Sequence, residues 1–298
     1  MVFCNSEEIK VMNIVTIQDK NYPKLLKQIG KDAPKQLYYK GKWNKEIFNH
    51  CLAVVGSRRM TIYGRQVAER IVGEVASAGV TIVSGFMYGV DATAHQAALK
   101  VGGRTIAVMP CGIDLIHPEY QQDLYAEILN NQGLIVSEYE GSMQPALWTY
   151  PRRNRIVAGL CQAALIIEAG EQSGSLITAE FAKKFKRKVF AVPGPITSEN
   201  SKGISQLLKE GAAAATCAGD ILREYGFSSR FTPEGPYATQ KTHNSLEIKI
   251  IEYLQREALS IDAISRNLGM PAAKMGTILS IMQLKGQIQQ EGNKYYLC

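Results

Sequence analysis

Between residues 51 and 192, short apolar runs alternate with amphipathic segments of helical length. The apolar runs are continuous, which is the pattern of strands that are covered on both faces. Repeated strand–helix–strand units with short links predict a doubly wound, mainly parallel α/β sheet whose ligands bind at the carboxyl ends of its strands. The predicted strands are residues 52–55, 80–84, 104–109, 134–137, 164–168 and 188–192, and the predicted helices are 64–77, 91–101, 118–130, 151–161 and 173–185.

The remainder of the chain divides by composition. A Lys-rich segment, 1–45, precedes the α/β domain, 46–225, and a linker rich in Gly, Pro, Ser and Thr follows at 226–243. Residues 244–298 then show three helical patterns and a terminal hairpin, with Gly292-Asn293 as its turn. This last pattern predicts a small winged-helix domain. Its third helix carries only Lys274 as a basic residue, which favours a protein-contact module over a DNA reader.

Charge is concentrated at the amino-terminal end. Residues 1–45 hold nine Lys and four acidic residues, a net charge of +5 out of +7 for the chain. Such a segment attracts polyanions, but a solvated lysine surface explains the same composition. Composition alone therefore leaves nucleic-acid binding by this segment open.

Several classes of protein are disfavoured. Every apolar run is interrupted before it reaches membrane-spanning length, and the first residues lack the features of a signal peptide. The six cysteines are scattered, with no pair at metal-ligand spacing. A Gly-x-Gly-x-x-Gly fingerprint and a Walker lysine are both missing, which counts against a nicotinamide dehydrogenase and a P-loop ATPase. We expect a cytoplasmic protein without metal, cofactor or membrane partner.

The first predicted strand ends in Gly56-Ser57-Arg58, just before a helix. Glycine permits close backbone approach, serine supplies a hydroxyl, and the planar guanidinium suits phosphate. Free N–H groups at the helix start add to the attraction for an anion. The turn therefore predicts phosphate binding, although many such turns are only tight connections.

Asp91 and His95 follow the second predicted strand at a spacing of one helical turn. An Asp/His pair at this spacing can act as an acid–base couple. Asp91 also lies where a helix N-cap is expected. We favour the cap, because no nucleophile accompanies the pair.

The segment Tyr150-Pro151-Arg152-Arg153-Asn154-Arg155 is the most informative in the chain. Proline suits the first helical position, so the three arginines would fall in the first turn, where cations oppose the positive helix end. An anion bound there would relieve the conflict, and Trp148 and Tyr150 would offer flat faces to bases. The pattern indicates single-stranded nucleic acid; the alternative is a solvated arginine cluster beside core aromatics.

A second small-residue turn, Ser173-Gly174-Ser175, opens the helix after the fifth strand. Its free N–H groups and hydroxyls could hold another anion, or one serine could simply cap the helix. Parallel topology would place this turn at the same sheet edge as Gly56-Ser57-Arg58.

Six segments, in order, resemble the DNA-processing protein A family (DprA, also called Smf). They are YPKLL with LYYKG, VGSR with YG, SGFMYGVDATAH, YPRRNRIVAGL, EAGEQSGSLITA and VFAVPG. The resemblance covers residues 22 to 297 approximately. It implies an extended Rossmann-like domain that binds single-stranded DNA, loads a RecA-type recombinase during natural transformation, and commonly dimerises.

Carried over by position, the family's Phe-Pro-x-Arg-Asn-Arg motif begins here at Tyr150, which keeps a stacking face. Met87 stands where a small residue is usual, Ser205 replaces a common Asn, and residues 1–20 are too few for the helical amino-terminal domain of many members. The predicted DNA-binding residues are Gly56, Ser57, Arg58, Tyr150, Arg152, Arg153, Asn154, Arg155, Ser173, Gly174 and Ser175.

The leading hypothesis is thus a non-enzymatic, single-strand-binding recombination mediator. The alternative is a Rossmann-like enzyme that binds small nucleotides or cleaves nucleoside monophosphates with a Gly-Gly-x-Gly-Thr turn and a nearby Glu. Here the equivalent turn reads GEQSGSLIT and lacks the double glycine, although Glu168 and Glu180 are available.

Overall fold

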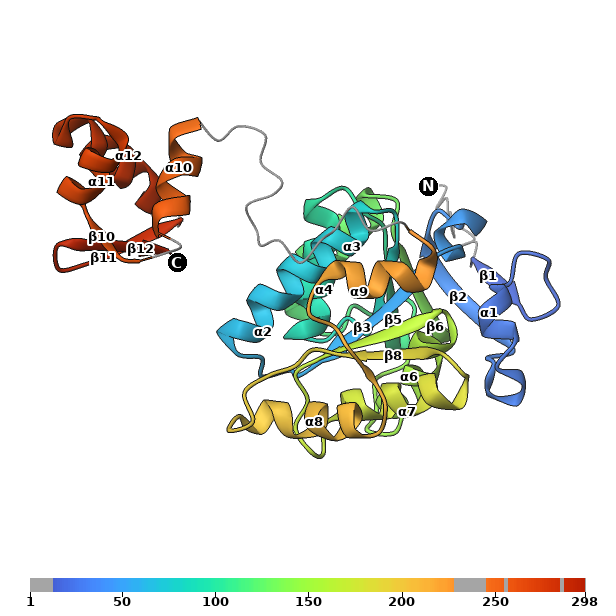
Figure 1. Cartoon of the computed structure of the whole chain (residues 1–298). Helices are drawn as coiled ribbons and strands as arrows, with labels where there is room; N and C mark the ends of the chain where they lie inside the picture. The colour runs from blue at the N-terminus through green and yellow to red at the C-terminus, as the bar shows by residue number, and fades with distance from the viewer. Residues whose placement is uncertain (1–12, 228–244, 255–256, 285–286, 298) are drawn as a thin grey trace, which may run out of the picture. The chain divides into compact units, whose positions relative to one another are not determined.

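The computed structural model of the chain describes residues 13–227, 245–254, 257–284 and 287–297 (Figure 1). The chain divides into two compact units, residues 1–233 and 234–298. Each unit has its own buried apolar core. Most of the predicted linker, residues 228–243, lies outside the described residues.

Within residues 13–227, the first unit is built on a nine-stranded sheet with the order β1-β2-β6-β5-β4-β3-β7-β8-β9. The strands from β3 to β9 run parallel, and β1 and β2 form an antiparallel edge. The strands are β1 (Ile14–Thr16), β2 (Gln36–Gly41), β3 (Cys51–Gly56), β4 (Thr81–Ser84), β5 (Thr105–Gly112), β6 (Leu134–Tyr139), β7 (Ala163–Ile167), β8 (Lys188–Ala191) and β9 (Ala213–Ala214).

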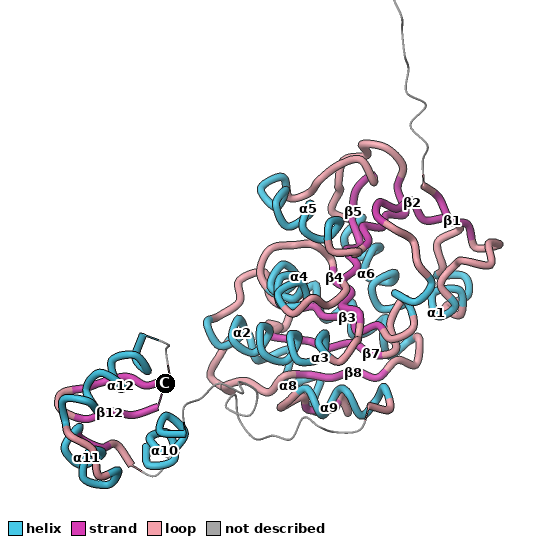
Figure 2. Tube along the Cα trace, turned by 90° about the horizontal axis from the view of Figure 1, so that it is seen from above, coloured by secondary structure: helices cyan, strands magenta, loops and turns pink. Residues whose placement is uncertain are grey.

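Helices cover both faces of this sheet (Figure 2). Along β3, alternate side chains enter two different cores, because successive residues of a strand point to opposite faces. One face of the sheet is covered by α1, α6, α7 and α8. The other face is covered by α3, α4 and α9, together with the π-helical turn that precedes α3. The helices are α1 (Lys24–Lys27), α2 (Ile62–Val67), α3 (Gly73–Ser77), α4 (Val90–Lys100), α5 (Gln122–Asn130), α6 (Thr149–Gly159), α7 (Gly174–Lys184), α8 (Lys202–Lys209) and α9 (Ala218–Leu222), with a π-helical turn (Ala68–Val72) joining α2 to α3.

The order of the strands reverses beside β3. From β3 the chain proceeds through β4 and β5 to β6, and then returns to β7, which pairs with the other side of β3. Such a switch point leaves a crevice at the carboxyl ends of the strands, which is where doubly wound sheets bind ligands. The predicted doubly wound, mainly parallel fold class is confirmed.

The Lys-rich segment, for which composition left a solvated surface and nucleic-acid binding open, is part of the folded sheet. Its strands β1 and β2 extend the sheet beside β6, and Val15, Leu26 and Leu37 are buried in the core. These strands were not predicted because their apolar stretches are short and lie between lysines. An antiparallel strand at the edge of a sheet needs to bury only one face, so it lacks a continuous apolar run. Of the lysines in residues 13–45, all but the partly buried Lys40 are exposed to solvent.

In the described residues of the second unit, three helices pack on a three-stranded sheet of order β10-β12-β11. Ile250, Ile264, Met275 and Leu279 form the centre of its core. The predicted winged-helix domain is confirmed. Its elements are α10 (Ser245–Leu254), β10 (Leu259–Ser260), α11 (Ile261–Leu268), α12 (Ala272–Leu284), β11 (Ile288–Glu291) and β12 (Lys294–Leu297).

None of the helices in the described ranges combines the length and the apolar character needed to cross a bilayer.

Candidate nucleic-acid interface

An open pocket of about 540 Å³ lies at the carboxyl ends of β3 and β7. It is walled by the β3–α2 turn, the β4–α4 turn and the amino-terminal ends of α6 and α7. Nine predicted site residues line it: Gly56, Ser57, Arg58, Tyr150, Arg153, Asn154, Ser173, Gly174 and Ser175. The other two, Arg152 and Arg155, line a separate hollow on the far side of α6.

Two glycines allow the turns of the pocket to meet. A Cβ atom on Gly56 would lie 1.8 Å from the carbonyl oxygen of Ile167, so any larger residue would push β3 away from β7. Gly89 has φ +80°, and a Cβ atom there would lie 2.4 Å from the carbonyl oxygen of Ser57. The β3–α2 and β4–α4 turns are therefore in backbone contact, and the Val90 N–H donates to the Ser57 carbonyl at 3.2 Å.

Arg58 is exposed and lies between two aromatic rings. Its guanidinium carbon is 5.3 Å from the centre of the Tyr150 ring and 5.8 Å from the centre of the Tyr88 ring. Both distances fall within the range of cation–π attraction, which limits the conformations of the arginine. The result is a cation held at the pocket wall beside two rings on which bases can stack.

Tyr150 is oriented by a residue that the sequence did not single out. The Tyr150 hydroxyl and His117 Nε2 are 2.8 Å apart, so the two groups share a hydrogen bond. Burial lowers the pKa of His117, and the nearby Arg153 and Arg58 lower it further. A neutral imidazole Nε2 can accept a hydrogen bond from the Tyr150 hydroxyl, which fixes the orientation of the phenol ring.

The amino-terminal end of α7 forms the opposite wall. Ser173 caps this helix by accepting from the Ser175 N–H, the two hydroxyls are 2.7 Å apart, and none of the described residues of the first turn is acidic. Asn154 ties the turn to α6 by donating to the Gly174 carbonyl at 3.2 Å. One turn further, Thr178 lines the pocket, and its buried hydroxyl has no hydrogen-bond partner among the described residues. Free N–H groups and hydroxyls here suit an anion.

Arg153 lines the floor of the pocket, and only 4% of its surface is exposed. Its guanidinium donates to the carbonyl oxygens of Gly85, directly after β4, and of Val108, within β5. Burial lowers its pKa to about 10, and the adjacent Asp91 opposes that shift. Arg153 thus fixes the start of α6 against the sheet.

The expectation that Asp91 caps a helix is wrong. Gly89 is the N-cap of α4, and the Asp91 carboxylate inside the first turn accepts from the Met87 N–H at 3.3 Å. Burial raises the pKa of Asp91, and Arg153 opposes the rise. Asp91 therefore acts as the buried partner of Arg153.

The alternative, in which Asp91 and His95 form an acid–base couple, is wrong as well. His95 Nδ1 contacts the Thr105 hydroxyl at 2.6 Å, and burial lowers its pKa to about 3. A histidine that stays neutral inside the core does not exchange protons with solvent near neutral pH.

Arg152 and Arg155 share a partner that the sequence did not reveal. Both guanidiniums contact Glu138 at the end of β6, at 3.2 and 2.6 Å respectively. Helix α6 begins at Thr149, so Pro151 is its third residue instead of its first. A carboxylate of the protein itself therefore stabilises part of the arginine cluster that suggested a bound anion.

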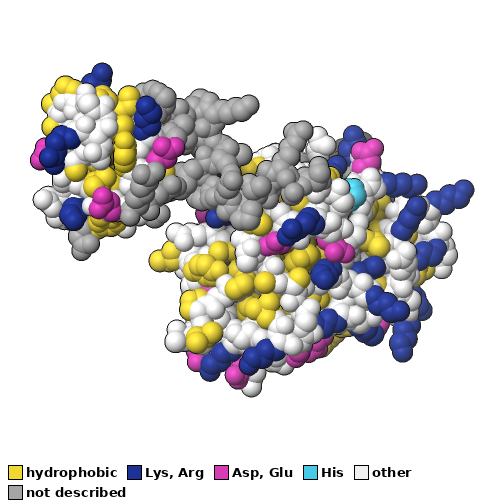
Figure 3. Space-filling view, in the orientation of Figure 1, with side chains coloured by type: hydrophobic (Ala, Val, Ile, Leu, Met, Phe, Trp, Pro, Cys, Tyr) yellow, Lys and Arg dark blue, Asp and Glu magenta, His cyan; other side chains and the backbone are white. Residues whose placement is uncertain are grey.

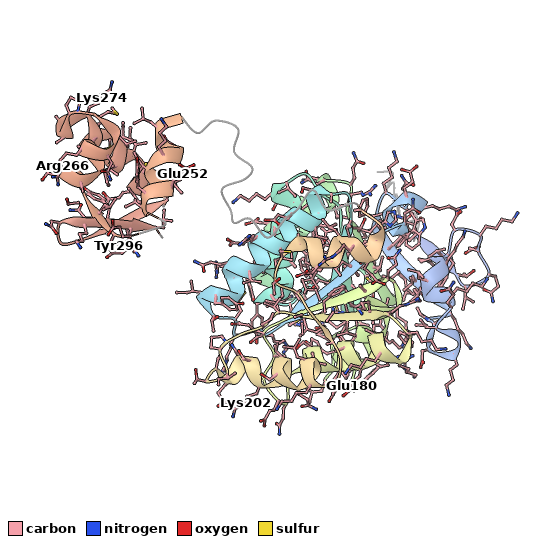
Figure 4. The ribbon with its side chains drawn as sticks, viewed as in Figure 1. Glu180, Lys202, Glu252, Arg266, Lys274 and Tyr296 are labelled. Carbon is pink, nitrogen blue, oxygen red and sulfur yellow. The ribbon has the colours of Figure 1, made fainter. Side chains whose placement is uncertain are left out.

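The two carboxylates that the enzymatic alternative would use do not line the pocket. Glu168 is buried and accepts from the backbone N–H and the hydroxyl of Thr61 at the start of α2. Glu180 is exposed on α7, two turns beyond its amino-terminal end (Figure 4). Among the described residues, Asp91 is the one carboxylate that lines the pocket.

The sequence reasoning did not single out Tyr88 and Arg59, which line the pocket, or His117, which contacts the lining residue Tyr150. Tyr88 lies in the SGFMYGVD segment, in which Met87 and Asp91 were singled out from the sequence and Tyr88 was not. Arg59 follows the predicted turn directly, and its carbonyl accepts from the Asn200 side chain at 2.8 Å. His117 contacts Tyr150 across 33 residues of sequence, and no local pattern indicates such a contact.

In the second unit, α12 presents Lys274 among small and apolar residues (Figure 4). The expectation of a protein-contact module for this unit remains a prediction.

Comparison with known proteins places these features in a family. Residues 13–226 match the family model described as DNA recombination-mediator protein A, and residues 234–294 match the DprA winged helix domain. Protein Smf of Escherichia coli is 36% identical over 262 residues, which cover 86% of this chain and 70% of that protein. DNA processing protein DprA of Streptococcus pneumoniae is 40% identical over 222 residues, covering 74% of this chain and 77% of that protein.

Two solved structures of DprA proteins also match this chain. The X-ray structure of DprA from S. pneumoniae matches with a TM-score of 0.68 and 40% identity, over 75% of this chain and 77% of that one. A structure of DNA processing protein A from Helicobacter pylori, solved to describe its single-stranded DNA binding mode, matches with a TM-score of 0.64 and 32% identity, over 72% of this chain and 96% of that one. The chain therefore belongs to the DNA recombination-mediator protein A family, also known as DprA or Smf.

Proposed function

We propose that this recombination mediator binds single-stranded DNA in the pocket at the carboxyl ends of β3 and β7. The observation that carries the proposal is Arg58, held between the rings of Tyr88 and Tyr150 and placed on the same pocket as the amino-terminal end of α7. A guanidinium beside flat rings suits a phosphate beside unstacked bases, and the helix end suits a second phosphate. The single-stranded DNA binding described for the H. pylori relative supports the same ligand.

Within the pocket, the residues take different roles. Gly56, Ser57 and Arg58 would contact the DNA backbone, and Ser173, Gly174 and Ser175 would hold a neighbouring phosphate by hydroxyl and N–H groups. Tyr150 would stack a base, and Arg153 and Asn154 would position Tyr150 by holding the start of α6. Arg155 would act indirectly, through the placement of α6.

Two further parts of the proposal follow from the family resemblance. The protein would load a RecA-type recombinase onto the bound strand during natural transformation, and it would act as a homodimer. Co-purification of a RecA-type recombinase with this protein, and sedimentation of the protein alone, test these parts separately from DNA binding.

The direct test of DNA binding compares single- and double-stranded oligonucleotides of one sequence at two salt concentrations. We expect the single strand to bind more tightly, because only unpaired bases can stack on the rings. Its affinity should fall as salt rises, since phosphate contacts release counterions. Equal affinity for both forms, or an affinity independent of salt, would contradict the proposal.

A further inference from the structure

A second hollow, of about 810 Å³, lies on the other side of α6. Arg152 and Arg155 line it from α6, Glu138 and Tyr139 from the end of β6, and Lys31 and Lys35 from the segment before β2. The hollow therefore joins the basic amino-terminal segment to the helix that also walls the first pocket.

The acidic groups of this hollow are already paired. Glu138 is shared by Arg152 and Arg155, and Asp32 pairs with Lys184 of α7 at 2.6 Å. Basic side chains are gathered over the side of the first unit that carries α1 and β2 (Figure 3). Lys31 and Lys35 are exposed, so the hollow offers excess positive charge to an anionic ligand.

An exposed aromatic residue contacts two residues that line the second hollow. Trp148 is the N-cap residue of α6, and 51% of its surface is exposed. Its ring packs edge-on against Tyr139 at 5.9 Å and lies 5.9 Å from the Arg152 guanidinium. Tyr150, two residues later, faces the first pocket, so rings that can stack bases lie on both sides of the helix start.

We propose that the bound strand continues from the first pocket, past the start of α6, into this second hollow. Bases would stack on Trp148, and phosphates would contact Arg152, Lys31 and Lys35. The inference rests on the proposed function, and extends it by assigning the basic amino-terminal segment to the DNA-binding surface. The ligand is the same polymer, beyond the nucleotides that fill the first pocket.

Tryptophan fluorescence gives the first test, because the chain has two tryptophans and they differ in environment. Trp43 packs between Tyr39 and Phe48, at 4.6 and 5.0 Å, whereas Trp148 contacts Tyr139 and Arg152 of the second hollow. An oligothymidylate of about 16 nucleotides should quench the fluorescence, whereas one of about four nucleotides should bind without quenching. The variant Trp148→Phe should lose the quenching. Equal quenching by both lengths, or none with the longer one, would overturn the inference.

Charge removal gives the second test. We expect the double variant Lys31→Ala, Lys35→Ala to weaken binding of the longer oligomer roughly fivefold per lysine at about 0.1 M salt. The slope of log affinity against log salt should fall by about 0.7 per lysine, and binding of the short oligomer should not change. The matched control is Lys20→Ala, Lys24→Ala, which removes two exposed lysines of the same segment that line a different hollow.

The outcomes separate this inference from the proposed function. If the two double variants behave alike, the second hollow is not part of the DNA-binding surface, and the first pocket is unaffected. If neither oligomer binds the unmodified protein, the proposed function itself fails.

Discussion

At the residue scale, Arg58 combines charge with a fixed position. Tyr88 and Tyr150 flank its guanidinium, and the Tyr150 hydroxyl bonds to His117. A planar guanidinium can contact a phosphate through its edge while its face stays on a ring, which a lysine ammonium cannot do. Position and charge should therefore both contribute to the affinity for DNA.

We predict that Arg58→Ala lowers the affinity for single-stranded DNA by roughly tenfold, and that Arg58→Lys lies between this variant and the unmodified protein. The loss should be the same for all base sequences, because phosphate contacts carry no sequence information. Binding titrations with several oligonucleotide sequences measure it. Arg65→Ala, which removes an exposed arginine of α2 away from the pocket, is the control. A loss restricted to one sequence would count against phosphate contact.

His95 makes the fold sensitive to acid. Its pKa is lowered to about 3 by burial, against 6.5 when it is exposed, so the unfolded chain binds a proton more readily than the folded one. Stability contributed by the neutral form is therefore present above pH 6.5 and is lost as the pH falls toward 3. At pH 5 the loss amounts to about 2 kcal/mol relative to neutral pH.

Denaturant unfolding at several pH values tests this prediction. His95→Gln should flatten the dependence of unfolding free energy on pH between 7 and about 5, whatever its effect on absolute stability. His50→Gln, at an exposed position, serves as the control. An unchanged pH dependence in the His95 variant would show that another group is responsible.

At the element scale, α6 is attached to the sheet by a shared carboxylate. Arg155 donates to both oxygens of Glu138 at 2.6 Å and to the Asp32 carbonyl, and its side chain is only 10% exposed. Arg152 contacts the same carboxylate, but its side chain is 51% exposed. The two arginines thus share one carboxylate, but Arg155 is more buried and also has the Asp32 carbonyl as a partner.

We predict that Glu138→Gln destabilises the fold by about 3 kcal/mol, because it leaves the buried Arg155 without a counter-charge. Arg152→Ala should change stability by less than about 0.5 kcal/mol, since exposed pairs contribute little. Thermal or denaturant unfolding measures both. Equal effects of the two substitutions would mean that burial does not decide the strength of these pairs.

The elements that could be predicted from sequence are those with continuous apolar runs. The six predicted strands are present as β3 to β8, and their parallel order brought Gly56-Ser57-Arg58 and Ser173-Gly174-Ser175 to one edge of the sheet. The pairing of Arg152 and Arg155 with Glu138 could not be predicted, because the partner comes from a neighbouring strand. Local helix electrostatics pointed to an anion, and the protein supplies one itself.

At the scale of the whole molecule, the two units have separate cores, and the pocket belongs entirely to the first. We predict that a protein truncated after residue 233 keeps its affinity for single-stranded DNA. If the winged-helix unit contacts protein partners, the truncated protein should nevertheless lose recombination activity in cells. A large loss of affinity on truncation, measured by the same titrations, would show that the second unit contributes to DNA binding.

The most direct test of the central claim is to locate the bound DNA by photo-crosslinking. Oligothymidylate carrying photoreactive bases would be cross-linked to the full chain, and the modified peptides identified by mass spectrometry. We predict cross-links at Tyr88 and Tyr150, which flank Arg58, and their loss in Arg58→Ala. Cross-links confined to residues 244–298, with none at the pocket, would contradict the account.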